Sequence, residues 1–276
     1  MPSLYAHYRF GQEVRGTLKN REKRIVETYP ELFLIGLHGP DILFYYHPLT
    51  RNFVNQTGYD MHDKAGKEFF EYAVKVVRKY SNHGAYLSYV YGFICHFALD
   101  KACHGYIDEK IAESGVSHAE IETEFDRALM VKDGFNPIRH RLTKHITPSM
   151  RNARVISCFY KGITARQVRT ALREMIISHS LLRAPSKTKR KVINSVLKAS
   201  GYYDSIHGMV VNIRKNPKCD DSTETLSTLY QEVKREAVRL IQEYKGYVEE
   251  NKPLDSVYCY TFGSKLVEEG EKKNGK

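Results

Sequence analysis

The sequence lacks an apolar run long enough to cross a membrane. A helix that spans a bilayer needs roughly 20 consecutive apolar residues. The longest candidate, residues 86–99, is shorter and runs directly into Asp100 and Lys101. The first residues, MPSLYAHYRFGQE, also lack the basic segment and apolar stretch of a secretory signal. We therefore expect no transmembrane segment and no signal peptide.

Cysteines are few: the chain has five, an odd number, and none in CxxC spacing. This pattern excludes a disulfide framework as the main source of stability and is typical of a reducing compartment. We expect the protein to be cytoplasmic. The alternative is a secreted chain whose signal has been removed from the sequence.

Strand-like alternation is also scarce, whereas apolar residues recur at i, i+3 and i+4 along most of the chain. The pattern predicts an all-α, multi-helix fold in a single domain over residues 1–276. The predicted helices are residues 14–28, 30–37, 64–81, 84–105, 117–131, 149–160, 164–182, 187–200, 202–215 and 222–251. We expect the last residues, about 269–276, to form a frayed tail.

Three helix starts are marked by capping residues. Ser117 has Glu120 three residues later, which predicts a capping box, and Thr164 and Ser222 each precede a helical pattern. Two segments, 38–63 and 132–148, lack a helical period and are predicted to be ordered connections. A connection as long as 38–63 is usually functional.

Positive charge is in excess, with 43 lysines and arginines against 32 aspartates and glutamates, a net charge of +11. Such a balance favours anionic partners, including phosphate esters, nucleic acid and anionic membrane surfaces. It is equally consistent with a feature that only promotes solubility. The basic run KTKRK at 187–191 is interpreted as a solvated loop or helix start.

The most unusual segment is residues 86–106, YLSYVYGFICHFALDKACHGY, which is apolar and aromatic but contains His96, Asp100 and His104. A helix places His96 and Asp100 on one face, with His104 about 80° from His96 around the axis. A buried charge is costly unless it is paired or bound to a metal. This segment is therefore a candidate for metal binding.

Further candidate ligands lie on both sides of that segment. His118 and Glu122 repeat the i, i+4 arrangement on the next predicted helix, Asp41 and His62 lie in segment 38–63, and His7 is near the start of the chain. Imidazole and carboxylate ligands without clustered thiolates are typical of catalytic zinc. More than four candidates imply more than one ion, an arrangement suited to phosphoester hydrolysis.

In their order and types, these residues resemble the ligands of the bacterial zinc-dependent phospholipase C family. The resemblance covers about residues 1–130 and rests on His7 before RFG, GPD at 39–41, His62, GFICHFALD at 92–100, His104 and H-x-x-x-E at 118–122. The fungal single-strand-specific nucleases share the all-α fold and trinuclear zinc geometry of that family. The resemblance thus assigns the metal-binding part to about residues 1–131 and leaves additional C-terminal helices at about 149–251.

The resemblance implies two or three zinc ions. It places one with Asp41, His62, His96 and Asp100, a second with His104, His118 and Glu122, and a third with His7 and a bridging Asp100. It also implies that Asp41 is the general base. Secreted members begin with a tryptophan that completes the third site, and this chain contains no tryptophan. The third site is therefore expected to be weaker, differently completed or empty.

The predicted function is hydrolysis of phosphodiester bonds by a water activated at a multinuclear zinc site, as in a phospholipase C. The sequence does not distinguish three substrates: a phospholipid headgroup, nucleic acid and a small soluble ester. Alternatives are a nuclease or small-molecule phosphoesterase of the same fold, an HD-type phosphohydrolase using His62-Asp63, and a non-catalytic helical binding module with a vestigial metal site.

The other cysteines and histidines near these positions are interpreted as structural residues rather than ligands. Cys95 and Cys103, which flank candidate ligands, are interpreted as packing thiols. The other histidines are expected at the surface or at helix ends: His38, His47, His83, His140, His145, His179 and His207. The best exceptions are His38 and His47, which lie in segment 38–63.

Overall fold

The structure of the protein, a computed structural model, describes residues 4–267 and is built from helices. The α-helices are α1 (Leu4–Thr17), α2 (Asn20–Thr28), α3 (Pro30–Gly36), α4 (Phe53–His62), α5 (Gly66–Lys79), α6 (His83–Ser114), α7 (His118–Lys132), α8 (Met150–Ser157), α9 (Ala165–Leu182), α10 (Lys187–Ser200), α11 (Tyr203–Ile206) and α12 (Asp220–Glu249). The 3-10 helices are η1 (Gly39–Tyr45), η2 (His207–Met209), η3 (Pro217–Cys219) and η4 (Ser256–Cys259). Within residues 4–267, β-pairing is confined to two isolated bridges, so the all-α prediction is confirmed. The tail predicted at 269–276 lies outside the described residues.

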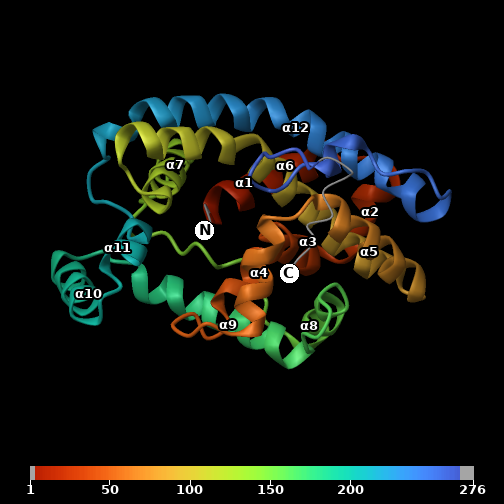
Figure 1. The fold of residues 1–276 in the computed structure, drawn as a ribbon, viewed down its shortest axis with the longest axis horizontal. Helices are drawn as coiled ribbons and strands as arrows, with labels where there is room; N and C mark the ends of the chain where they lie inside the picture. The colour runs from red at the N-terminus through yellow and green to blue at the C-terminus, as the bar shows by residue number, and fades with distance from the viewer. Residues whose placement is uncertain (1–3, 268–276) are drawn as a thin grey trace, which may run out of the picture.

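Helix α6 runs through the centre of the molecule. Every residue from Ala85 to Asp100 is buried, as expected of a helix that is apolar on all sides and therefore covered on all sides. It packs against α3, α12, α1, α2 and α5. Figure 1 shows α12 along one long edge of the molecule, beside α6 and α7.

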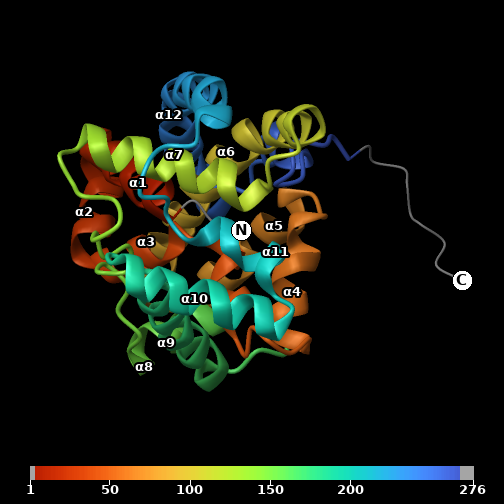
Figure 2. The ribbon, with the colours of Figure 1, turned by 90° about the vertical axis from the view of Figure 1, so that its left-hand side faces the viewer.

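A second group of helices contacts α6 less extensively. Here η1 packs against α4 and α9, α8 packs against α9, and α10 packs against α11. The helices α10 and α11 lie at one end of the molecule in Figure 1 and face the viewer in Figure 2. The element η1 also contacts α6, so it connects the two groups of helices.

The start of the chain differs from the prediction. A single helix was expected over 14–28, but α1 begins at Leu4, and the chain breaks before α2 at Asn20, whose φ is 51°. Burial explains the early start, because Leu4, Phe10 and Val14 all face the core from α1. Their stripe is interrupted by His7, which obscures the apolar period in the sequence.

The prediction that segment 38–63 is a loop was wrong, because η1 and α4 fill most of it. Asn52 caps α4 through a reciprocal capping box with Asn55. The predicted helix 202–215 was also wrong: only the short α11 and η2 form there. The non-helical connection at 132–148 is confirmed over nearly all of its length.

The predicted caps are partly confirmed. Thr164 forms a full capping box with Gln167 at the start of α9. The Ser117 side chain accepts from the backbone N–H of Glu120, but the Glu120 carboxylate accepts from the Asn212 and Asn216 side chains instead of completing the box. Ser222 is not a cap.

Helix α12 begins at Asp220, two residues before Ser222, so Ser222 lies inside the helix. Among the described residues, we find no helix with the length and apolar character required to cross a bilayer.

The crossing of α3 and α6 depends on two glycines. A Cβ atom on Gly92 would lie 2.2 Å from the carbonyl oxygen of Phe33 and 2.9 Å from the Cα of Gly36. Both obstacles are backbone atoms, so a side chain at this position forces the two helices apart. This crossing sets the position of η1, which follows α3 directly.

We predict that Gly92→Ala lowers the free energy of unfolding by about 1–3 kcal/mol or more, because overpacking displaces α3. Urea denaturation monitored by circular dichroism measures this change. Gly16→Ala is the matched control, since Gly16 is exposed in α1 with no atom within 4 Å of a built Cβ. It should leave stability unchanged or raise it by up to about 1 kcal/mol. Equal stability of the two variants would contradict the close crossing.

Candidate metal centre

Asp100 lies at the middle of the predicted site, surrounded by imidazoles. Its Oδ1 atom is 3.1 Å from Nε2 of His7 and 3.7 Å from Nε2 of His104. Its Oδ2 atom is 3.1 Å from Nε2 of His96 and 3.8 Å from Nε2 of His62. Asp100 is only 4% exposed. One buried carboxylate therefore joins four histidines from three helices, α1, α4 and α6.

The element η1 and helix α4 bring Asp41 and His62 to this cluster. Nε2 of His62 is 3.0 Å from Oδ1 of Asp41, and its Nδ1 bonds the carbonyl oxygen of Gly58, which fixes the ring orientation. Nε2 of His96 is 4.0 Å from the same Asp41 oxygen. Gly39, with φ of 46°, permits this approach, because a Cβ there would lie 2.2 Å from the His96 ring.

A second group lies one turn further along α6. Nε2 of His104 is 3.5 Å from Oε1 of Glu122, and Nε2 of His118 is 3.3 Å from the same oxygen. The turn between α6 and α7 uses Gly115 in the left-handed conformation, with φ of 66°. A cavity of about 20 Å³, lined in part by His7, Asp100 and His104, connects the two groups and has room for one small ion or water.

Helix α1 is held by a carboxylate from α7. The buried side chain of Asp126 accepts from the backbone N–H groups of Tyr5 and Ala6, at 2.9 and 2.7 Å. These amides belong to the first turn of α1, where N–H groups have no partner within the helix. His7 follows directly, so Asp126 fixes the position of His7.

The site keeps its carboxylates ionised. Burial by itself would raise the pKa of Asp100, but His96, His104 and the hydrogen bond from His7 hold it well below its usual range. Burial lowers the pKa of His104, and Asp100 and Glu122 outweigh that effect and raise it to about 9. For His96 burial prevails over the nearby carboxylates and its pKa is lowered, which leaves the imidazole neutral.

These donors fit a zinc site. They form three groups whose donor atoms lie within 4.8 Å of one another: His7, His96 and Asp100; Asp41, His62 and His96; and His104, His118 and Glu122. Nε2 of His96 and of His118 are buried and make no hydrogen bond, although carboxylate oxygens lie close to both. Imidazole nitrogens beside carboxylate oxygens are the donor set that zinc takes in catalytic sites.

The two cysteines beside the site lie among packed side chains. Cys95 is 1% exposed and Cys103 is 6% exposed, and burial raises the pKa of both thiols. Both therefore stay protonated. This agrees with the interpretation of packing thiols, although Cys103 lines the small cavity.

Of the remaining histidines, His38, one of the two named as exceptions, does not lie at the surface. It is fully buried, and its Nε2 is hydrogen-bonded to Nε2 of His145 at 2.7 Å. Tyr8, the residue after His7, stacks its ring on that of His145 with a centroid distance of 4.3 Å. Burial lowers the pKa of His145 to about 3 and holds that of His38 well below its usual value. The pair is therefore neutral and packs behind the site.

The C-terminal segment also reaches the site, through a residue that showed no signal in the sequence. The Phe262 ring is 1% exposed and packs against His62 and His96, with centroid distances of 5.1 and 5.8 Å. A bridge between Ala65 and Thr261 holds this segment beside α5. Phe262 excludes water from one side of two imidazoles.

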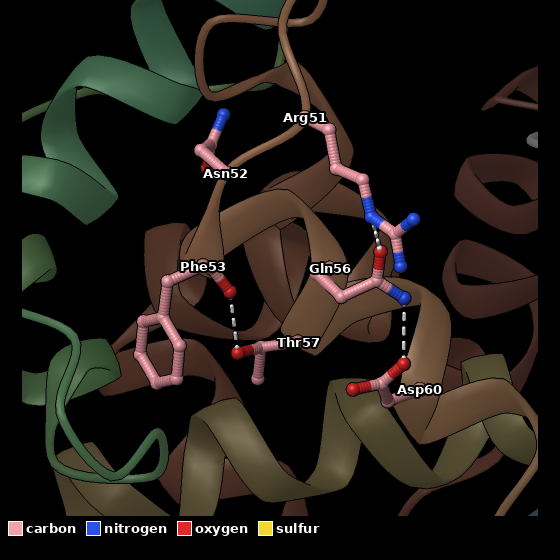
Figure 3. A pocket seen from close by; sticks show the side chains of 6 residues that line it. All are labelled: Arg51, Asn52, Phe53, Gln56, Thr57 and Asp60. Carbon is pink, nitrogen blue, oxygen red and sulfur yellow. Dashed lines mark hydrogen bonds between the residues drawn. The ribbon is translucent and has the colours of Figure 1, made fainter.

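Two other features are separate from the eight predicted ligands. Asp63, the partner required for an HD-type doublet, is exposed at the end of α4 and belongs to none of the three donor groups. A surface hollow of about 250 Å³ on α4 is lined by Arg51, Asn52, Phe53, Gln56, Thr57 and Asp60 (Figure 3). None of the predicted ligands lines it.

In that hollow, side chains bind one another. Arg51 donates to Gln56, and Gln56 donates to Asp60, at 2.8 and 2.7 Å (Figure 3). Three of its polar side chains are therefore paired with one another.

The fold and the site together define a class: an all-α protein with a buried cluster of imidazoles and carboxylates suited to zinc. A sequence model of the family described as "Zinc dependent phospholipase C" matches residues 6–171. The chain belongs to this zinc-dependent phospholipase C family, which makes it a member of a family of zinc-dependent hydrolases. No curated protein and no solved structure matches the chain.

The family match confirms the resemblance and extends it. The resemblance in the sequence reached about residue 130, whereas the match continues through α8 and into α9. Helix α9 packs against η1, the element that carries Asp41. The family region therefore includes the three donor groups and the first residues of the helix that packs against η1.

We predict that Asp126→Ala weakens zinc binding about 10- to 100-fold, because the freed first turn of α1 no longer positions His7. Zinc affinity of the apoprotein, measured by competition with a chromophoric chelator, tests this. Asp108→Ala is the control, since Asp108 is exposed on α6. Unchanged affinity in a folded Asp126→Ala protein would show that His7 needs no such support.

Proposed function

We propose that the protein hydrolyses phosphodiester bonds at a centre of two or three zinc ions, in the manner of a phospholipase C. The observation that carries the proposal is the position of Asp100 among four imidazoles, beside the separate group of His104, His118 and Glu122. Asp100 lies 3.7 Å from His104 of that second group, and donor groups this close favour neighbouring ions. Neighbouring ions suit the transfer of a phosphoryl group between two oxygens.

We assign the ligands as the family resemblance implies. Asp41, His62, His96 and Asp100 would hold one ion, His104, His118 and Glu122 a second, and His7 with Asp100 a third. The 3.1 Å separation of His7 and Asp100 supports a shared site for that pair. His96 lies close to both Asp41 and Asp100, which supports its place in the first set.

Asp41 is proposed as the general base. Burial by itself would raise the pKa of this carboxyl, but His96 and His62 lower it below its usual value. The carboxylate is therefore ionised at neutral pH and able to accept a proton from an attacking water. Bound zinc would supply a Lewis acid that makes that water more acidic and neutralises the phosphoryl oxygens.

Several observations bear on the substrate. The family description names a phospholipase C, which favours a phospholipid-type substrate. The net charge of +11 is consistent with any anionic phosphodiester and with peripheral contact to an anionic membrane surface. We propose a phospholipid headgroup as the substrate, with nucleic acid and small soluble esters as the alternatives.

The purified protein is predicted to contain zinc and to hydrolyse bis-p-nitrophenyl phosphate. Removal of zinc by a chelator should abolish hydrolysis, and added zinc should restore it. Asp41→Asn is expected to lower kcat by at least about 100-fold, because it removes the proton acceptor. His83→Ala is the matched control, since His83 is exposed at the start of α6.

The same assay decides the substrate class when phosphatidylcholine and single-stranded DNA are added to the panel. Preferred cleavage of phosphatidylcholine supports the phospholipase assignment. Preferred cleavage of DNA would replace it with a nuclease. A protein without zinc, or one whose activity resists the chelator and the Asp41→Asn substitution, would refute the proposed function altogether.

A further inference from the structure

A large apolar groove opens beside the candidate metal centre. It has a volume of about 770 Å³ and lies between the η1–α4 connection and helices α9, α10 and α11. Its lining includes five large apolar side chains that are also exposed: Leu49, Tyr59, Ile177, Leu181 and Tyr202. Leu49 and Leu181 are each 62% exposed. A contiguous apolar surface of this kind marks an interaction site, whereas single exposed apolar residues are common on any protein.

The inner end of the groove borders the candidate centre. Phe44 lines the groove, stacks on Tyr59 at 4.3 Å and packs against His62 with a centroid distance of 5.2 Å. Asp41 lies three residues before Phe44 on the same element, η1. A single layer of aromatic side chains therefore separates the groove from two predicted ligands.

Most of the excess positive charge of the chain lies on the two long helices that border this groove. Residues 165–200, which cover α9 and α10, contain nine lysines and arginines and one acidic residue, Glu174. That is +8 of the net charge of +11 for the whole chain. Helix α10 has no acidic residue and also exposes Val192 and Val196, at 57% and 60%.

We propose that this face docks onto an anionic phospholipid bilayer. We define the docking face as Leu49, Ile177, Leu181, Val192 and Val196 with the exposed lysines and arginines of 165–200. Its aliphatic side chains enter the boundary between headgroups and acyl chains, while its cations contact anionic headgroups. The inference rests on the proposed function in one respect: docking here brings the phosphodiesters of the membrane beside the candidate centre.

The composition of the face favours lipid over nucleic acid. Proteins that bind single strands combine cations with aromatic rings on which bases stack. Here the most exposed apolar groups on α9 and α10 are aliphatic: Ile177, Leu181, Val192 and Val196. Aliphatic side chains beside lysines are the pattern of an interfacial helix.

The test is co-sedimentation of the full chain with two kinds of vesicle, phosphatidylcholine alone and phosphatidylcholine with phosphatidylglycerol. The wild-type protein should bind the anionic vesicles more tightly, and salt should weaken this binding. Leu181→Asp and Lys191→Glu should each weaken it roughly fivefold or more. Both positions are exposed, so the fold should be preserved, which circular dichroism verifies.

Matched controls are available on helices outside the face. Val131→Asp, on α7, replaces an apolar side chain that is 53% exposed, and Lys75→Glu reverses an exposed charge on α5. Both should bind anionic vesicles as the wild type does. The Asp41→Asn variant should also bind them normally, so docking is measured independently of hydrolysis.

Three results would overturn the docking face. They are equal binding to both kinds of vesicle, wild-type binding by Leu181→Asp and Lys191→Glu, and a loss of single-stranded DNA binding in these variants without loss of vesicle binding. A wild-type protein that binds anionic vesicles through this face but fails to hydrolyse any diester would refute the proposed function and leave the docking face standing.

Discussion

A negative charge buried in the centre of a helical protein is the constraint on which this structure depends. Asp100 is 4% exposed in the middle of the longest helix and would be strongly destabilising without compensation. Four imidazoles from α1, α4 and α6 lie within 4 Å of its oxygens. The packing of these three helices is therefore coupled to the electrostatics of a single carboxylate.

The rest of the fold holds those imidazoles in place. Asp126 fixes the first turn of α1, the bond from His62 to Gly58 orients that ring, and Phe262 covers the rings of His62 and His96. Gly39 allows η1 to approach His96, and the crossing at Gly92 brings α3 and therefore η1 to α6. Such outer contacts orient metal ligands and tune their affinity.

The parts of the site that follow a local period could be predicted from the sequence. His96, Asp100 and His104 share α6, and His118 and Glu122 share α7, at the spacing that a helix requires. The parts that depend on distant residues could not. Asp126 meets Tyr5 across 121 positions, and the pair of His38 and His145 spans 107, so no periodicity within one segment reveals either contact. Helix α4 was missed because its buried residues, Val54, Asn55 and Gly58, give no apolar period, and η1 is a 3-10 helix without the α-helical period.

The central claim is that Asp100 joins the donor groups into one centre. The zinc content of the protein tests this claim most directly. Metal analysis by mass spectrometry should compare the wild-type protein with Asp100→Asn, which keeps the shape of the side chain but removes its charge. We expect the wild type to hold more than one zinc ion per chain and Asp100→Asn to lose at least one while remaining helical. The same zinc content in both proteins would contradict it.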